Sequence, residues 1–248
     1  MTTVLTVEQL SKSYRRFKAV DALSFTLNEG DFVGFIGPNG AGKSTTMGCI
    51  AGVLNADAGK IRVGDVDVME QTTEARKLIS FVPQHLELFD YLTGLEYLQF
   101  IADLRGVETA ARDEQIEDLM ALTELTEARH RIVKEYSGGM ARKLAICGAL
   151  IGEPRLLLLD ESFVGLDPES TYRIRQRLLK FCEGGGAILL SSHILDMLER
   201  ICTRVVMLVD GQLKLDEPME ALREQFKSGP HEDLTTLYLH ESGKIDTL

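Results

Sequence analysis

Residues 31–45 read DFVGFIGPNGAGKST, a short apolar run followed by a glycine-rich loop and by the start of a helical pattern. Glycines let consecutive backbone N–H groups of such a loop point inward and bind an anion. A helix that begins at Gly42 adds the partial positive charge of its N-terminus. The stretch therefore predicts a strand, a phosphate-binding loop and a helix, in that order.

The loop matches the spacing G-x-x-x-x-G-K-[ST], which is typical of proteins that bind a nucleoside triphosphate. In that pattern Lys43 reaches the terminal phosphates, and the hydroxyl group of Ser44 binds a magnesium ion. A glycine-rich turn before a helix, without a ligand, is the alternative interpretation. The residues predicted to bind the nucleotide here are Gly37, Pro38, Asn39, Gly40, Ala41, Gly42, Lys43, Ser44 and Thr45.

Elsewhere, short apolar runs alternate with helical patterns. The runs include RLLLLDE at 155–161, AILLSS at 187–192 and RVVMLVD at 204–210. Strands made of continuous Leu, Ile and Val are buried on both faces, which is typical of parallel sheets with flanking helices. The sequence therefore predicts an α/β fold.

Two regions interrupt this alternation. Residues 1–30 and about 58–80 resemble short alternating strands, which predicts an antiparallel edge. Residues 85–150 are expected to be helical throughout and, being too long for one crossover, to form a helical insertion. We expect one main domain over 1–217 and, over 218–248, a short C-terminal tail with one helix from Met219 to Phe226.

Composition excludes several classes of protein. The 248 residues are 44% apolar and 26% charged, which is ordinary for a soluble globular chain. A net charge of −11 disfavours binding to nucleic acid, and none is expected as a partner. There is no secretory signal and no apolar run near the roughly 18–20 residues of a membrane helix, so we expect a cytoplasmic protein. Four cysteines without a CxxC pair predict buried, reduced thiols.

The run at 155–161 ends in two carboxylates. Asp160 follows the predicted buried strand and is placed to hold magnesium through water. Glu161 is placed to polarise an attacking water molecule. An acidic helix cap after a core strand is the alternative for both residues.

A second glycine-containing helix start lies in EYSGGMARKLAICGAL, residues 135–150. With it, nearly the whole chain resembles the ATP-binding subunit of an ABC transporter. Ser137, Gly138 and Gly139 match the core of the LSGGQ signature of that family, with departures at Tyr136 and Met140. SGGM followed by basic residues resembles subunits of the ABC-2 export type. The resemblance implies a P-loop ABC ATPase with a RecA-like parallel-sheet core, an antiparallel β edge subdomain and a helical insertion.

The resemblance assigns roles to four more positions. Tyr14 is similar to the aromatic residue that stacks on adenine, and Gln84 to the residue that contacts magnesium and senses the membrane partner. Asp167, in Gly-Leu-Asp at 165–167, resembles the loop that touches the opposite subunit. His193 resembles the switch histidine that contacts the γ-phosphate and assists catalysis. The alternatives are an isolated loop tyrosine, an exposed polar residue and a structural histidine. Ser162 stands where the family usually has proline, which puts the positioning of Glu161 in question.

The family resemblance also implies partners. Ser137–Gly139 of one subunit would cover the ATP and Mg²⁺ held by the loop of a second ATPase subunit, in either a homodimer or a heterodimer. A chain without a membrane helix would act on integral membrane permease subunits, and would lie on the inner face of the membrane through them. The apolar run after Gln84, with Leu88 and Phe89, predicts a groove for such a partner. Packing against the following helix is the alternative for that run.

Two other functions are alternatives to a transporter subunit. A soluble ABC-type ATPase acting on ribosomes or DNA usually carries paired cassettes or basic extensions, whereas this chain has one cassette and an acidic balance. A P-loop kinase or GTPase would not need the signature, and the guanine-specifying NKxD motif is missing from the sequence. The sequence therefore favours an ATPase subunit of an exporter.

Overall fold

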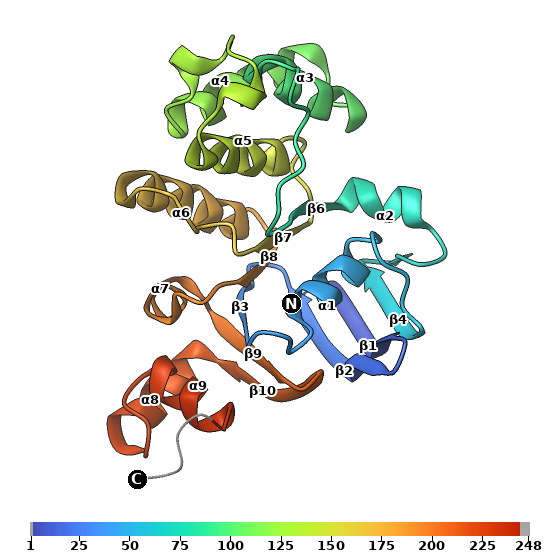
Figure 1. Cartoon of the computed structure of the whole chain (residues 1–248), viewed down its shortest axis with the longest axis vertical. Coiled ribbons are helices and arrows are strands. Elements are labelled where there is room, and N and C mark those ends of the chain that lie inside the picture. The colour runs from blue at the N-terminus through green and yellow to red at the C-terminus, as the bar shows by residue number, and fades with distance from the viewer. Residues whose placement is uncertain (1, 244–248) are drawn as a thin grey trace.

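The computed structural model describes residues 2–243. Its centre is a six-stranded sheet in the order β10-β9-β3-β8-β7-β6 (Figure 1). The strands are β3 (Phe32–Ile36), β6 (Ile79–Val82), β7 (Leu156–Asp160), β8 (Ala187–Ser191), β9 (Arg204–Val209) and β10 (Gln212–Pro218). All neighbours pair in parallel except β10, which runs antiparallel to β9. The predicted α/β fold with a parallel core is confirmed.

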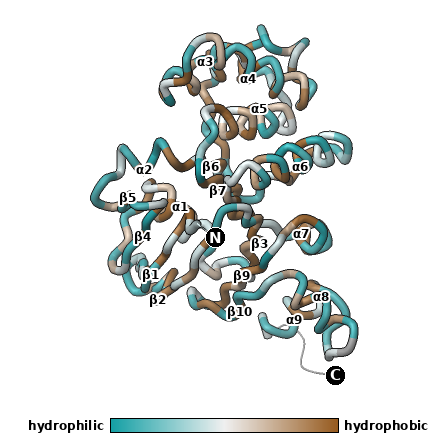
Figure 2. Tube along the Cα trace, turned by 180° about the vertical axis from the view of Figure 1, so that it is seen from behind, coloured by the Kyte–Doolittle hydropathy of each residue, from teal (hydrophilic) through white to brown (hydrophobic). Residues whose placement is uncertain are grey.

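Side chains of the central strands alternate between two cores. In β7, Leu157 and Leu159 belong to one hydrophobic cluster, whereas Leu156 and Leu158 belong to the other. Helices α6 (Pro168–Glu183) and α7 (Leu195–Ile201) contribute to the first cluster, and α1 (Lys43–Ile50) contributes to the second. Figure 2 shows the central strands as the most hydrophobic part of the trace. Burial on both faces explains why these strands read as unbroken apolar runs.

A four-stranded antiparallel sheet packs beside α1, in the order β2-β1-β4-β5 (Figure 1). Its strands are β1 (Thr3–Tyr14), β2 (Phe17–Asn28), β4 (Ala58–Val63) and β5 (Val66–Asp67). The antiparallel edge is as predicted, but strands throughout 58–80 were wrong. Residues 72–78 form α2 (Thr72–Leu78), because Ala, Arg, Lys and Leu favour helix, and acidic and basic residues lie at the matching ends.

The insertion contains three α-helices, α3 (Gly94–Leu104), α4 (Thr109–Leu122) and α5 (Gly138–Leu150), and two short 3-10 helices at Thr126–Ala128 and Val133–Glu135. Helix throughout 85–150 was wrong, since residues 85–93 are irregular. Helix α3 begins only at Gly94 because Thr93 and Glu96 form a capping box, in which Oγ1 of Thr93 accepts from the Glu96 N–H at 3.2 Å. Figure 1 shows this helical subdomain at the far side of β6 and β7 from the C-terminal helices.

The C-terminal segment holds two helices rather than the one predicted. Helix α8 (Met219–Ser228) agrees with the predicted helix, and α9 (Leu234–Glu241) follows it. The sequence signal of α9 is weak because its threonines are poor helix formers. Its start is fixed by Asp233, whose Oδ1 accepts from the Thr236 N–H at 2.7 Å, and Leu234 and Leu237 are buried. The end of the predicted tail, 244–248, lies outside the described residues.

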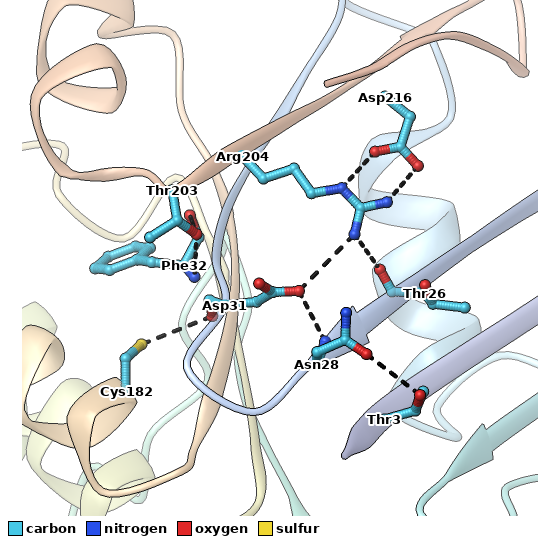
Figure 3. A network of polar contacts seen from close by, with 9 residues as sticks. All are labelled: Thr3, Thr26, Asn28, Asp31, Phe32, Cys182, Thr203, Arg204 and Asp216. Carbon is cyan, nitrogen blue, oxygen red and sulfur yellow. Dashed lines mark hydrogen bonds and ion pairs between the residues drawn. The ribbon is translucent and has the colours of Figure 1, made fainter. Parts of the chain in front are cut away.

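A partly buried arginine ties the two sheets together at their shared end (Figure 3). Arg204 on β9 donates through Nε and Nη2 to both oxygens of Asp216 at 2.5 Å, and through Nη1 to the Thr26 carbonyl on β2 at 2.9 Å. Asp31, just before β3, accepts from the Asn28 N–H at 2.7 Å. These bonds fix the start of β3, and the glycine-rich loop leaves the other end of that strand.

The four cysteines are buried free thiols, as predicted. Burial raises the pKa of the Cys147 thiol to about 12, so this sulfur stays protonated and inert. Among residues 2–243 there is no helix with the length and apolar character needed to cross a membrane.

Candidate functional site

The glycine-rich loop joins β3 to α1, and the backbone of β2 and of β9 packs closely against it. Gly42 has φ +99°, and a Cβ there would lie 2.3 Å from the carbonyl oxygen of Ala19. A Cβ at Gly37 would lie 2.2 Å from the carbonyl oxygen of Leu208. Any larger residue would therefore push the loop off β2 and β9. Glycine at these two positions follows from both the backbone conformation and the lack of space.

Lys43 is the buried cation of this loop, with only 8% of its surface exposed. Its Nζ donates to the carbonyl oxygens of Gly37 at 2.6 Å and Pro38 at 3.1 Å. The loop thus wraps around the ammonium group and holds it at the first turn of α1. This is where a bound phosphate would meet both the cation and the helix N-terminus.

One cavity of about 510 Å³ collects most of the predicted site residues. It is lined by Tyr14, Phe17, Ala19, Asn39, Gly40, Ala41, Gly42, Lys43, Ser44, Thr45, Gln84, Asp160, Glu161 and His193. Gly37 and Pro38 lie behind it, bonded to Lys43. The cavity therefore joins segments that are more than 150 residues apart in sequence, at the carboxyl ends of β3, β6, β7 and β8. Ligands bind at this edge in open parallel sheets.

The two carboxylates at the end of β7 have different surroundings. Asp160 accepts a hydrogen bond at Oδ1 from the Ser191 hydroxyl on β8. Glu161 is 5% exposed, yet neither of its carboxylate oxygens accepts a hydrogen bond from the described residues. Nε2 of His193 lies 3.3 Å from Oε1 of Glu161. A buried carboxylate without donors is poised to accept a proton from a bound water molecule.

The backbone at Glu161 has φ +51°, in the left-handed region. Non-glycine residues occupy this region at a cost and often do so at functional sites. The next residue, Ser162, is fully buried where the family resemblance led us to expect proline. The strained conformation therefore forms without proline at that turn.

The donors that face the cavity suit magnesium. The Ser44 hydroxyl, the Gln84 amide oxygen and the Asp160 carboxylate are hard oxygen ligands on three separate segments. Among residues 2–243 no cluster of three or more His, Cys, Asp or Glu side chains could cage a metal by itself. A metal here would share its coordination with phosphate oxygens and water, which is how magnesium is usually bound.

Tyr14 lies at the end of β1, on the rim of the cavity, with 45% of its surface exposed. Phe17 begins β2 after the same turn and is 60% exposed on the same rim. Phe17 was not among the site residues predicted from the sequence. Its signal was a second aromatic side chain three residues after Tyr14 in a tight hairpin, which brings both rings to one end.

The signature residues lie away from this cavity, at the N-terminus of α5. The Ser137 hydroxyl accepts from the Met140 N–H at 3.2 Å, and Gly138 is exposed. A Cβ at Gly139 would lie 3.1 Å from the Gly165 carbonyl oxygen. The structure therefore places Gly139 beside the chain's own 165–167 loop, and none of Ser137, Gly138 and Gly139 lines the chain's own nucleotide cavity.

The Asp167 side chain caps the N-terminus of α6. Its Oδ1 accepts from the Ser170 N–H at 2.8 Å, its Oδ2 accepts from the Ser170 hydroxyl at 2.6 Å, and Nζ of Lys143 lies 3.2 Å away. These Ser170 bonds, together with the Lys143 charge, hold the pKa of the Asp167 carboxyl well below its ordinary value. Asp167 stays outside the cavity, so nucleotide contact from it is still a prediction.

Arg142 is a second residue that sequence analysis missed. It lies on the first turns of α5, and its Nη1 donates to the Gln84 carbonyl oxygen at 3.1 Å. Burial lowers the pKa of its guanidinium, while the negative charges of Glu161 and Asp160 act in the opposite direction. Arg142 therefore connects the signature helix to the loop that carries Gln84. The only sequence signal was a basic residue after SGGM.

A second, larger groove of about 800 Å³ opens between the helical subdomain and the core. Leu86, Leu88, Tyr97, Ile101, Leu104 and Arg105 are among the residues that line it. Leu88 is half-buried, and Phe89 beside it is 51% exposed and packs edge-on against Phe100 at 5.1 Å. The apolar run after Gln84 is thus partly exposed along a groove.

Comparison with known proteins gives consistent matches. Residues 20–164 match the family model described as ABC transporter. The chain is 33% identical to the linearmycin resistance ATP-binding protein LnrL of Bacillus subtilis, over 85% of this chain and 68% of that protein. It is 38% identical to the Nod factor export ATP-binding protein I of Rhizobium etli, over 85% and 66%.

Two solved structures are similar over almost the whole chain. One is an ATP-binding subunit of an ABC transporter, with a TM-score of 0.91 and 30% identity, covering 96% of this chain and 99% of the other. The second is a dimer of the ATP-binding cassette MJ0796 in a post-hydrolysis state with ADP and Pi. Its TM-score is 0.78 at 25% identity, covering 87% of this chain and 98% of that one.

Proposed function

The chain belongs to the ABC transporter family, and we propose that it is the ATP-binding and ATP-hydrolysing subunit that energises a membrane exporter. The observation that carries this proposal is the separation of the two glycine-containing helix starts. One builds an open-sided cavity with the paired carboxylates, and the other is exposed at the N-terminus of α5. Such a chain needs a second copy to complete each nucleotide site.

In this proposal the loop residues 37–45 and Lys43 bind the phosphates of ATP. Tyr14 and Phe17 flank the base at the rim of the cavity. Ser44, Gln84 and Asp160 would hold Mg²⁺, which neutralises charge that develops on the phosphates. Backbone N–H groups and the ammonium group act in a site partly closed to water, where their electrostatic effect is strongest.

Glu161 acts as the general base. Its unsatisfied carboxylate takes a proton from the attacking water, and His193, 3.3 Å from Oε1, orients that carboxylate and lies beside the terminal phosphate. Gln84 and His193 lie at exposed positions on the rim, so bound nucleotide would complete their placement. The chemistry is hydrolysis of the terminal phosphoanhydride bond to ADP and phosphate.

Pairing follows from the same geometry. In a head-to-tail dimer, the exposed Ser137–Gly139 start of each chain covers the ATP in its partner's cavity, and the two helix dipoles converge on the phosphates. Loss of the γ-phosphate after hydrolysis removes the bridging charge and loosens the pair. The dimer of MJ0796 supports this arrangement by similarity.

The membrane partner is proposed to dock in the groove along Leu88 and Leu104, which would hold the chain at the cytoplasmic face of the membrane. Similarity to a Nod factor export subunit and to a linearmycin resistance subunit supports an export role. We propose that 1–217 is the ATPase domain, with the helical subdomain inserted within about 85–150, and that 218–243 is an appended helical segment.

The proposed function is tested by separating binding from hydrolysis. Glu161→Gln should bind ATP with near wild-type affinity and hydrolyse it about 10²-fold more slowly or worse, as expected for loss of a general base. Lys43→Ala should lose binding and hydrolysis together. Lys60→Ala, which removes an exposed cation on β4, is the matched control and should behave like wild type. Wild-type turnover in Glu161→Gln would remove Glu161 from this role.

A further inference from the structure

Strand β8 is a run of buried apolar residues that ends in one buried polar residue, Ser191. Its other residues, Ala187, Ile188, Leu189 and Leu190, are all apolar and fully buried. Ser191 ends the strand with no exposed surface. A buried hydroxyl group is costly unless it is hydrogen-bonded, so its partner is informative.

Ser191 forms hydrogen bonds with both Asp160, the last residue of β7, and Glu161, which follows it. The strands β7 and β8 are in parallel register with Asp160 opposite Ser191. The Ser191 hydroxyl donates to Oδ1 of Asp160, which is itself only 2% exposed. The Ser191 carbonyl oxygen accepts from the Glu161 N–H at 3.1 Å. One residue of β8 therefore fixes the Asp160 side chain and the Glu161 backbone.

The hydrogen bond from the Glu161 N–H to the Ser191 carbonyl oxygen lies where the backbone is strained. Glu161 has φ +51°, and its N–H bond to Ser191 is the last link between β7 and β8 before the chain turns away. The backbone bond would survive replacement of the serine, whereas the hydroxyl bond would not. Substitution of Ser191 thus isolates the contribution of the hydroxyl group to Asp160.

We propose that Ser191 is a positioning residue for magnesium, which acts by orienting the Asp160 carboxylate. Its hydroxyl occupies Oδ1 and leaves the other oxygen of Asp160 for the metal and its water. The inference rests on the proposed function, because it assumes that Asp160 faces a metal–nucleotide complex. Outer-shell partners of this kind typically change metal affinity by about 10–100-fold when they are removed.

The test measures metal binding apart from hydrolysis. Mn²⁺ binding to the complex of the chain with ADP is followed by electron paramagnetic resonance, and ADP binding is measured separately in EDTA. Ser191→Ala should weaken Mn²⁺ binding by about 10-fold or more, with ADP affinity in EDTA unchanged. Ser191→Cys keeps a group of similar size with a poor donor and should also weaken Mn²⁺ binding. Ser191→Thr, which restores a hydroxyl, should recover it.

Ser80→Ala is the matched control, because it removes a buried hydroxyl from β6 that bonds Arg105 and not Asp160. It should leave Mn²⁺ affinity unchanged. Unchanged Mn²⁺ binding in both Ser191→Ala and Ser191→Cys would overturn the proposal, as would equal losses of Mn²⁺ and metal-free ADP binding. A wild-type chain that binds no ADP at all would instead contradict the proposed function.

Discussion

The nucleotide loop and the signature both put glycines at the start of a helix, but their surroundings are opposite. Around Gly42 the backbone of Ala19 would lie 2.3 Å from any Cβ, and Lys43 is buried behind it. At Gly138 a Cβ would meet no other atom within 4 Å, and Ser137 is exposed. The nucleotide loop therefore belongs to a formed binding cavity, whereas the signature start is an exposed surface.

The two helix starts differ in how many of the groups needed for nucleotide binding lie within the same chain. The nucleotide loop already has its cation, its carboxylates and its rim within one chain. The signature start has a cap from its own Ser137 side chain but lies outside that cavity. An exposed helix N-terminus of this kind can bind an anion brought by another molecule. The two regions therefore describe one site divided between two chains.

The largest expected effect is complementation between damaged chains. Lys43→Ala damages the loop and Ser137→Arg damages the signature, so each variant alone should lose ATPase activity. A mixture of the two should recover about a quarter of the wild-type rate, because half of the random pairs are mixed and each mixed pair holds one intact site. The measurement is steady-state phosphate release from the separate and mixed proteins.

The control mixes Lys43→Ala with Lys43→Ala,Ser137→Arg, which leaves no intact loop and should stay inactive. Equal rates in the two mixtures would show that each site lies within one chain.

The second prediction contrasts the glycines directly. Gly42→Ala meets the Ala19 carbonyl oxygen and a left-handed backbone, so ATP binding by single chains should fall by about 10–100-fold, from strain of roughly 1–3 kcal/mol. Gly138→Ala has room and should leave that binding unchanged while slowing turnover of the pair. Binding is measured by titration with fluorescent ATP at chain concentrations too low for pairing. Similar losses of ATP affinity in Gly42→Ala and Gly138→Ala would contradict the proposed difference between the two helix starts.

The parts of the fold that local sequence controls were predictable. The unbroken leucines of β7 and the loop at 37–45 have strong local patterns, and both are as predicted. Helix α9 was missed because its stability comes from burial of Leu234 and Leu237, not from helix propensity.

The same limit applies to the site. Phe17, Arg142 and Ser191 were missed, because their importance comes from partners far away in the sequence. The local signals at Phe17 and Arg142, an aromatic residue soon after Tyr14 and a basic residue after SGGM, do not identify those partners. Gln84 and His193 were found only through the family resemblance, although the structure does bring both of them into the cavity.

The third prediction concerns the groove, which lies outside both halves of the nucleotide site. Leu88→Ser with Phe89→Ser should leave basal ATPase activity of the isolated chain nearly intact and weaken assembly with the membrane subunit. The two side chains would contribute about 3–5 kcal/mol if buried by a partner. Leu213→Ser, at another partly exposed apolar position on β10, is the control. A pull-down with the membrane subunit measures docking, and a thermal melt of the isolated variant measures core packing. A lower melting temperature together with reduced ATPase activity would show that Leu88 packs in the core and would contradict the groove.

The smallest effect is expected at Asp167, which caps α6 beside the signature helix. Asp167→Ala should lower the melting temperature by about 2–4 °C, as for loss of a helix cap. Because the folded-state pKa of Asp167 is depressed, the ionised carboxylate stabilises the fold fully above its ordinary value of 3.8. That contribution is lost as the pH falls toward the folded-state pKa, so the difference in melting temperature should shrink in acid. Asp65→Ala, which removes a carboxylate at an exposed turn, is the control and should leave the melting temperature at neutral pH unchanged.

The most direct measurement of the divided site is the mass of Glu161→Gln in solution with ATP and Mg²⁺, by light scattering. Slow hydrolysis should trap the closed state, so the mass should double from that of one chain, 27.5 kDa, when ATP is added. Adding Ser137→Arg should return the mass to that of a single chain, although ATP still binds in the cavity. A double variant that still pairs on ATP would contradict the claim that the signature of one chain completes the nucleotide site of another.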